Sequence, residues 1–145
     1  EFVNFLADLY GVSKEQRKER IDYFQNLFAL GDAIYNPISS YSHGMKQKIT
    51  IMSALVHNPK LWILDEPLTG LDPESIFQVK EAMKKHAAEG NIVFFSSHVI
   101  EVVEKVCTKI CIINGGKLQC IYSLKELKEK SVTRHYKAWW LYFGK

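Results

Sequence analysis

The stretch Leu61-Trp62-Ile63-Leu64-Asp65-Glu66-Pro67 decides the fold of this chain. Four consecutive large apolar residues, set between Pro59 and Pro67, predict a short strand that is buried on both faces, as in a parallel sheet. Asp65 and Glu66 follow at the carboxyl end of this strand, where open α/β sheets bind their ligands. An aspartate there can hold Mg²⁺ on nucleotide phosphates, and an adjacent glutamate can orient or deprotonate an attacking water. Taken alone, the pair also fits a strand that simply ends in solvent.

Three further motifs flank this strand. Tyr41-Ser42-His43-Gly44-Met45 lies upstream, and Leu71-Asp72-Pro73 and Ser96-Ser97-His98 lie downstream. Together with the strand and its two acidic residues, these segments resemble four motifs of the ABC-type ATPases, which in chain order are the signature motif, Walker B, the D-loop and the switch histidine. The resemblance extends from the first helix to about Tyr122. It implies an α/β fold with a partial P-loop NTPase-like (ABC ATPase) core and a helical subdomain. The core would be a three-layer parallel sheet with an antiparallel edge hairpin.

The resemblance assigns roles to three residues at the carboxyl edge of the expected sheet. It implies that Asp65 binds Mg²⁺ and that Glu66 is the catalytic carboxylate that acts on the attacking water. His98, at a strand end in line with both carboxylates, would be the second catalytic residue, contacting the γ-phosphate and orienting Glu66 and the water. An isolated histidine is more often a core residue, but this position favours the functional interpretation.

The signature motif and the D-loop supply the expected nucleotide-binding residues, which are Ser42, His43, Gly44, Met45 and Asp72. The start of a helix offers unpaired backbone amides and a positive dipole end to phosphate. In the family this motif clamps the γ-phosphate of ATP held by the opposite subunit, and Asp72 would link the two active sites. The family's usual form is Leu-Ser-Gly-Gly-Gln, and Met45 cannot supply the polar side chain of that glutamine. A purely capping role would explain Ser42 but not Gly44.

The sequence contains no G-x-x-x-x-G-K-[ST] loop that could cradle phosphates. In the family this loop lies before the position where the present chain begins, so the resemblance identifies the C-terminal part of an ATPase domain. ATP hydrolysis, with ATP and Mg²⁺ as cofactors, is expected of the complete domain, whereas this chain alone is expected to be inactive. The expected division is a helical subdomain over 1–58, the Walker B side of the core over 59–132 and a basic aromatic tail over 133–145.

Hydrophobic periodicity and turn residues predict the remaining elements. A first helix carries Phe2 and Leu9 and is stopped by Gly11, and Ser13 caps a second helix that is stopped by Gly31. The later elements are a helix from the signature motif to Val56, a helix from Pro73 to Glu89, a strand from Ile92 to Ser96, a helix from Val99 to Val106, a strand from Lys109 to Ile113, a turn at Asn114-Gly115-Gly116, a strand from Leu118 to Tyr122 and a helix capped by Ser123 and Glu126.

Composition limits the class of protein. The 145 residues are 47% hydrophobic and 24% charged, with a net charge of +3, which is typical of one globular domain. Because Lys and Glu alternate along the expected helices, no nucleic-acid partner is expected. Three cysteines without zinc-like spacing favour a reducing compartment, with Cys107 and Cys111 as small buried residues. No apolar run has the length needed to cross a bilayer, so any membrane association would require a partner.

The resemblance also indicates partners and location. The signature motif and Thr69-Gly70-Leu71-Asp72-Pro73 look like those of bacterial drug, peptide or ion exporters. This implies an ABC transporter subunit that couples ATP binding and hydrolysis to export. It would lie peripherally at the cytoplasmic face of the cell membrane, with permease subunits docked on residues 1–37 and a second ATPase domain completing a dimer. The alternatives are a soluble ABC-type ATPase of translation or DNA repair, and a non-catalytic interaction module.

The tail from Arg134 to Lys145 interleaves aromatic residues with Arg and Lys. Such a pattern can stack on nucleic-acid bases or anchor at a membrane interface. Packing against the sheet or an adjoining domain is the favoured prediction, because the aromatic side chains would otherwise form a large exposed apolar patch.

Overall fold

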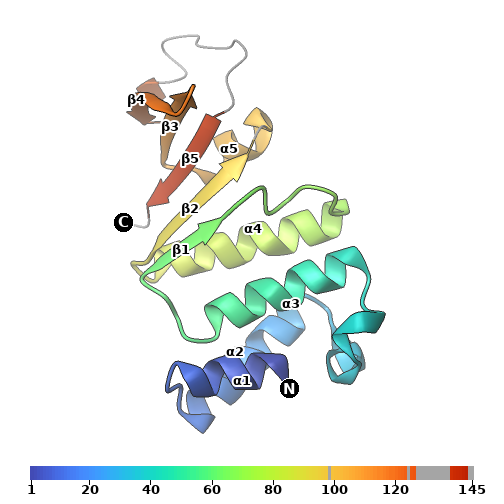
Figure 1. Ribbon diagram of the computed structural model, residues 1–145. Coiled ribbons are helices and arrows are strands. Elements are labelled where there is room, and N and C mark those ends of the chain that lie inside the picture. Colours follow the sequence, from blue (N-terminus) through green and yellow to red (C-terminus); the bar gives the residue numbers. More distant parts are fainter. Residues whose placement is uncertain (98, 124, 127–137, 144–145) are drawn as a thin grey trace. The chain divides into compact units, whose positions relative to one another are not determined.

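The computed structural model describes residues 1–97, 99–123, 125–126 and 138–143 (Figure 1). It divides into two compact units. The helical unit comprises Glu1–Pro59 and Gly70–Ala82, and the sheet unit comprises Lys60–Thr69 and Met83–Lys145. The elements in chain order are α1 (Phe2–Leu9), α2 (Lys14–Leu27), the 3₁₀ helices η1 (Gly31–Tyr35) and η2 (Ile38–Ser40), α3 (His43–Leu55), β1 (Leu61–Leu64), α4 (Pro73–Ala88), β2 (Ile92–Ser97), α5 (Ile100–Val106), β3 (Lys109–Asn114), β4 (Lys117–Ser123) and β5 (Ala138–Phe143).

The helices of the helical unit begin where the sequence predicts them to begin. The Ser13 hydroxyl accepts a hydrogen bond from the Gln16 backbone amide at 3.2 Å and caps α2. Ser42 caps α3 in the same way, accepting from the Met45 amide at 3.2 Å. Each cap satisfies one of the amides that a helix leaves unpaired in its first turn, so both predicted starts are confirmed.

The predicted end of α2 at Gly31 is wrong by several residues. The helix ends at Leu27, and Ala29 takes the left-handed conformation with a φ of 50°. The Ala29 amide donates to the Asn26 carbonyl and the Leu30 amide donates to the Gln25 carbonyl, which is the pattern of a Schellman motif. Leu30 is 5% exposed, so the burial of its side chain offsets the strain of a left-handed alanine.

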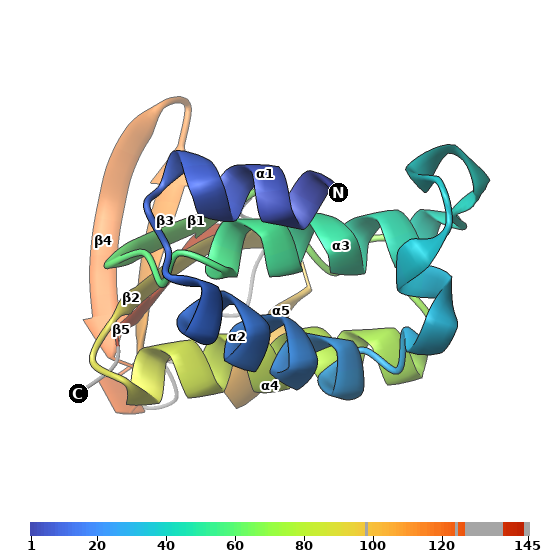
Figure 2. The same ribbon diagram turned by 90° about the horizontal axis from the view of Figure 1, so that it is seen from below.

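The core of the helical unit forms where α1 lies beside α3 (Figure 2). Ala7 on α1, Phe28 after α2 and Met52 on α3 are fully buried. Ile49 and Val56 continue the apolar stripe of α3 and are also buried. The methionine of this stripe at position 52 therefore fills the core.

His57 lies just after α3 in an apolar setting. Its ring stacks on Tyr10, with the ring centroids 3.9 Å apart and an interplanar angle of 9°. Its Nδ1 atom is buried and has no hydrogen-bond partner in the described part of the chain. Burial, and secondarily the positive charge of Arg20, lower the pKa of His57 below its ordinary value of 6.5. The folded state therefore favours the neutral imidazole.

Acidification is expected to destabilise the helical unit through His57. Because the folded pKa is lowered, the stabilisation is complete above the ordinary pKa of 6.5 and is lost as pH falls through the folded pKa. The melting temperature should therefore drop more between about pH 7.5 and about pH 5.5 for the wild type than for His57→Phe, which keeps an aromatic ring but does not titrate. If the melting temperature dropped equally in both proteins, His57 would not be the cause of the destabilisation by acid.

The sheet unit contains one mixed five-stranded sheet in the order β1-β2-β5-β3-β4. β1 and β2 are parallel, β5 is antiparallel to both β2 and β3, and β3 and β4 form an antiparallel hairpin. The predicted antiparallel edge hairpin is confirmed. The predicted parallel sheet is correct only for β1 and β2, because β5 lies between β2 and β3 (Figure 1).

The prediction that β1 is buried on both faces is wrong. Trp62 is 3% exposed and packs edge-on against His86 of α4, with the ring centroids 5.8 Å apart. Leu61 and Ile63, on the opposite face of the strand, are 52% and 65% exposed. Successive side chains of a strand point to opposite faces, and at β1 the described residues cover only one of them. The sheet is therefore not three-layered at this strand.

Other predictions of the sequence hold in the sheet unit. Cys107 and Cys111 are buried, and burial raises the pKa of the Cys107 thiol to about 12. Ser123 and Glu126 form the predicted capping box, in which the Ser123 amide donates to Glu126 Oε2 at 2.8 Å. The expected helix beyond this box and tail residues 133–137 and 144–145 lie outside the described residues. Among the helices that the structure describes, none is long and apolar enough to cross a membrane.

Candidate functional site

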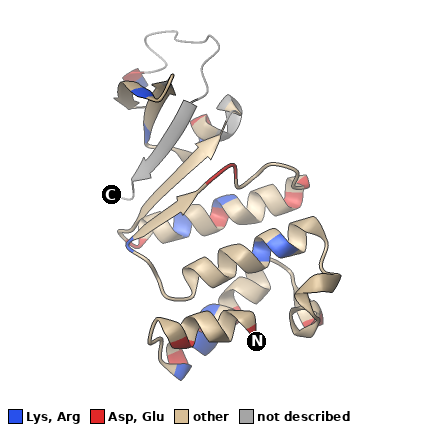
Figure 3. Cartoon of the chain, viewed as in Figure 1, with Lys and Arg blue, Asp and Glu red and all other residues tan. Residues whose placement is uncertain are grey.

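Asp65 and Glu66 lie at the carboxyl end of β1, next to the end of the parallel strand β2. The strands pair in register up to Leu64 and Phe95, so the residue that follows Phe95, Ser96, reaches the two carboxylate residues. Figure 3 marks acidic residues directly after β1. The sequence predicts this edge as the ligand-binding edge because the carboxyl ends of parallel strands meet there.

Ser96 joins the two acidic residues by its side-chain hydroxyl. The Ser96 Oγ atom donates to Asp65 Oδ1 at 2.5 Å and accepts from the Glu66 amide at 2.7 Å. Ser96 is 4% exposed, whereas Asp65 is exposed to solvent. One buried hydroxyl therefore contacts the side chain of one acid and the backbone of the other.

The backbone turns sharply at Glu66. Its φ of 44° lies in the left-handed region, which costs a residue with a side chain about 1–2 kcal/mol. The turn continues with a hydrogen bond from the Thr69 amide to the Glu66 carbonyl at 3.2 Å, and the Thr69 hydroxyl donates to Glu66 Oε2 at 3.3 Å. Strained backbone of this kind clusters at active sites and ligand-binding sites, although Ala29 shows that it also occurs at a helix end.

The signature residues form a second cluster, within the helical unit, at the start of α3. Ser42 is the cap, and His43, Gly44 and Met45 are the first residues of the helix. A Cβ atom built on Gly44 would lie 3.8 Å from Leu71 Cδ2 and 4.0 Å from Asp72 Oδ2. The start of α3 is therefore adjacent to Asp72.

Asp72 caps α4. Its Oδ1 accepts from the Ser75 amide at 2.9 Å, and its Oδ2 accepts from the Ser75 hydroxyl at 2.6 Å. The hydroxyl of Ser75, followed by the Ser75 amide, holds the pKa of Asp72 below its usual value. A carboxylate at this position stays ionised, which suits the positive end of the helix dipole.

His43 lies against Gly70 in the same cluster. A Cβ atom on Gly70 would lie 3.5 Å from the His43 Nε2 atom, and Gly70 has a φ of 74°. Glycine is therefore required here by the backbone conformation, not by lack of room. The imidazole of His43 is itself exposed to solvent.

The structure thus gathers the predicted residues into two local groups. Asp65 and Glu66 meet through Ser96, and Ser42, His43, Gly44, Met45 and Asp72 surround the start of α3; His98 lies outside the described residues. The sequence analysis did not predict that Ser96 contacts Asp65 and Glu66, or that Ser75 contacts Asp72. Two features of the sequence could have indicated these contacts. Ser96 lies at the end of the strand next to the one that carries the acidic pair, and Asp72 and Ser75 have the Asp-x-x-Ser spacing of a helix start.

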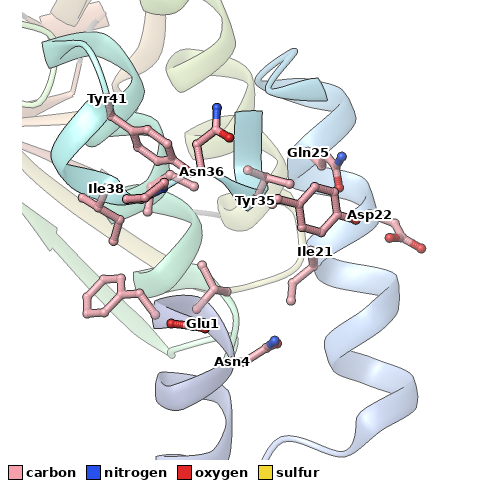
Figure 4. Close-up of a pocket in the computed structure, with 14 residues that line it drawn as sticks. Glu1, Asn4, Ile21, Asp22, Gln25, Tyr35, Asn36, Ile38 and Tyr41 are labelled. Atoms are coloured by element: carbon pink, nitrogen blue, oxygen red, sulfur yellow. The ribbon is translucent and has the colours of Figure 1, made fainter. Parts of the chain in front are cut away.

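A pocket of about 630 Å³ opens within the helical unit (Figure 4). It is lined by the start of α1, by α2, by η1 and η2, and by Ile49 of α3. Its acidic residues are Glu1 and Asp22, and no lysine or arginine lines it. Aromatic side chains stand at the pocket, among them Tyr35, which is 80% exposed. The pocket is therefore a concave surface of mixed polar and apolar lining that carries two acidic side chains.

Comparison with known proteins identifies the family of the chain. Residues 2–69 match the family described as ABC transporter. The chain is 39% identical over 136 residues to an uncharacterized ABC transporter ATP-binding protein of Bacillus subtilis, covering 92% of this chain and 45% of that protein. It is 36% identical over 137 residues to another of Nostoc sp., covering 93% of this chain and 41% of that protein.

A solved structure gives the same result. The structure of an ATP binding subunit of an ABC transporter matches 90% of this chain and 54% of its own length, with a TM-score of 0.83 and 28% identity. The chain belongs to the family of ABC transporter ATP-binding proteins. It spans about half or less of the length of these relatives, between 41% and 54%.

Proposed function

We propose that this chain is part of the ATP-binding subunit of an ABC exporter and carries the acidic edge and the signature cluster of its ATPase sites. The observation that carries the proposal is the pair Asp65 and Glu66, joined by Ser96 at the carboxyl edge of two parallel strands. Family membership supports ATP as the ligand. The direction of transport rests on the form of the signature motif in the sequence.

Asp65 is the proposed Mg²⁺-binding residue. Its carboxylate is exposed, and its Oδ1 is held by Ser96. In the described part of the chain, no three His, Cys, Asp or Glu side chains gather into a metal site. Mg²⁺ in nucleotide sites needs only one or two carboxylates together with the phosphates, so Asp65 fits such an ion. The ion would supply positive charge against the phosphate oxygens.

Glu66 is the proposed catalytic base. Glu66 lies in the left-handed turn after β1, and the Thr69 hydroxyl donates to one of its carboxylate oxygens. A carboxylate held in this way can accept a hydrogen bond from a water and orient it for attack. His98, by family resemblance, would contact the γ-phosphate and complete the arrangement.

Ser42, His43, Gly44 and Met45 are proposed to contact the nucleotide of a second ATPase domain. The start of α3 presents the amides of its first turn, beyond the one that Ser42 caps, and the positive end of its dipole. Asp72 would link the two sites across the dimer. The test is ATP turnover and cargo export by the complete protein in vesicles with its permease; turnover that proceeds unchanged without Mg²⁺ or without a membrane partner would contradict the proposal.

A substitution at Gly44 tests whether the start of α3 contacts phosphate or is only a helix start. Its φ is not positive, and an added Cβ atom would make only ordinary contacts, the nearest at 3.8 Å. Gly44→Ala is therefore expected to keep or slightly raise stability, by up to about 1 kcal/mol for an alanine in a helix. In the complete protein it is expected to lower ATP turnover about tenfold or more, because the methyl group blocks close approach of a phosphate to the backbone.

Gly70→Ala is the matched control for stability. The φ of 74° makes an alanine strained at that position, with a cost of about 1–2 kcal/mol. Thermal unfolding and ATP turnover measured on both variants distinguish the cases. If Gly44→Ala destabilised the protein as much as Gly70→Ala does, or left turnover intact, the glycine at position 44 would have no role toward phosphate.

The pocket of the helical unit is proposed as the docking site of the permease. It lies within the segment of residues 1–37 together with Tyr41, Ile38 and Ile49. Because its carboxylates are not matched by any lining lysine or arginine, charge complementarity favours a basic, amphipathic cytoplasmic segment of the permease as its occupant.

Crosslinking tests this docking site. Tyr35→Cys places a thiol at the pocket, and Phe77→Cys places one on α4, at a position that is 61% exposed. Tyr35→Cys is expected to crosslink to the permease and Phe77→Cys is not. Asp22→Lys should weaken the association more than Asp32→Lys, which makes the same change in charge away from the lining. Crosslinks from α4 alone would contradict the proposal.

A further inference from the structure

The hydroxyl of Ser96 is in contact with both residues that the proposed chemistry needs. It uses its one proton on Asp65 Oδ1 at 2.5 Å, and it accepts the Glu66 amide at 2.7 Å. The 2.5 Å separation lies at the short end of the range for a hydroxyl that donates to a carboxylate. Since Ser96 is 4% exposed, water has little access to replace either bond.

The two bonds fix different features of the site. The bond to Oδ1 sets the rotation of the Asp65 carboxylate, and Oδ2 accepts no hydrogen bond from the described part of the chain. That oxygen is thereby oriented for another ligand. The bond from the Glu66 amide stabilises the residue whose φ is 44°, and the direction of the Glu66 side chain follows from that backbone conformation.

We infer that Ser96 is a positioning residue of the ATPase site, which couples the orientation of the Asp65 carboxylate to the backbone turn at Glu66. The inference rests on the proposed roles of Asp65 and Glu66. The contacts of the Ser96 hydroxyl are with the two acidic residues, so it would act through them. Partners of this kind hold metal-binding carboxylates in one orientation, and their removal lowers metal affinity or activity about 10–100-fold.

A purely structural serine is the competing explanation. In that case the hydroxyl would only tie the ends of β1 and β2 together, and its loss would lower stability without changing the chemistry of the folded protein. Ser53 provides a matched control, because it is 3% exposed and its Oγ atom has no hydrogen-bond partner within the described residues. Ser53→Ala therefore removes a buried serine hydroxyl that makes no hydrogen bond to the described residues.

The experiment compares Ser96→Ala, Ser96→Thr and Ser53→Ala in the complete protein, at a temperature where melting curves show each to be folded. For Ser96→Ala we expect kcat to fall about 10–100-fold. The KM for ATP should change much less, and the Mg²⁺ concentration for half-maximal turnover should rise. Ser96→Thr keeps the hydroxyl and should recover most of kcat, and Ser53→Ala should match the wild type.

Hydrogen exchange of the present chain supplies a readout that does not depend on activity. The Glu66 amide should exchange faster in Ser96→Ala than in the wild type or in Ser53→Ala, because the bond that protects it is gone. A folded Ser96→Ala variant with unchanged kcat and Mg²⁺ dependence would overturn the inference. Unchanged exchange at Glu66 would overturn it as well, whether or not Ser96→Thr folds.

Glu66→Gln, measured alongside, separates this inference from the proposed function. If Glu66→Gln stops turnover while Ser96→Ala behaves like the wild type, only the role of Ser96 is wrong. If Glu66→Gln turns over ATP like the wild type, the proposed catalytic role of Glu66 fails first, and the inference about Ser96 fails with it.

Discussion

Glu66→Gln in the complete protein is expected to reduce ATP turnover about 10²–10⁴-fold, the usual contribution of a general base. Glutamine has nearly the same shape as glutamate, and its amide can still accept the hydrogen bond from Thr69, but it cannot take a proton from water. ATP should therefore remain bound and uncleaved, and two ATPase domains should stay closed around it. Single-turnover hydrolysis and the ATP-dependent dimer fraction measure the two effects.

Glu89→Gln is the control for this change. Glu89 is an exposed residue just after α4, so losing its charge should leave both turnover and nucleotide binding unchanged. If the ATP turnover of Glu66→Gln were within twofold of the wild-type value, Glu66 would not be the catalytic base. A variant that no longer binds ATP would instead assign Glu66 to binding.

Removing the residues after Val132 from this chain is expected to unfold the sheet unit. Every residue of β5 from Ala138 to Phe143 pairs with β2, and those from Ala138 to Leu141 also pair with β3. A backbone hydrogen bond contributes a net of about 0.5–1.5 kcal/mol. Loss of the whole strand therefore removes roughly 5 kcal/mol, which is comparable to the total stability of a small domain, about 5–15 kcal/mol.

Two proline substitutions refine this test. Leu141 lies between two neighbouring strands, whereas Leu118 in β4 pairs, among the residues that the structure describes, only with Ile113 of β3. Since proline cannot donate to a ladder and is tolerated only at sheet edges, Leu141→Pro should lower the melting temperature more than Leu118→Pro. If the truncated chain kept its melting temperature but lost binding to liposomes, the tail would be an interfacial anchor and the strand would not matter for stability.

The sequence by itself determined the features that depend on residues a few positions apart. The caps at Ser13, Ser42, Asp72 and Ser123 follow from a hydroxyl or carboxylate two or three residues before the amide that it accepts from, and such contacts form in any fold that contains the helix. The place of β1 and the turn at Gly115-Gly116 are equally local. The family followed from the same segments, because its motifs are short and keep their order.

Only the tertiary structure decided the features that join distant positions. The Ser96 hydroxyl meets Asp65 across 31 residues of sequence, and no periodicity predicts that contact. β5 lies inside the sheet because its backbone groups pair with strands on both sides. The aromatic composition of the tail indicates only that this segment avoids water. Leu61 and Ile63 are apolar yet exposed, since burial depends on which other parts of the chain cover a face, and hydrophobicity states only that covering that face would be favourable.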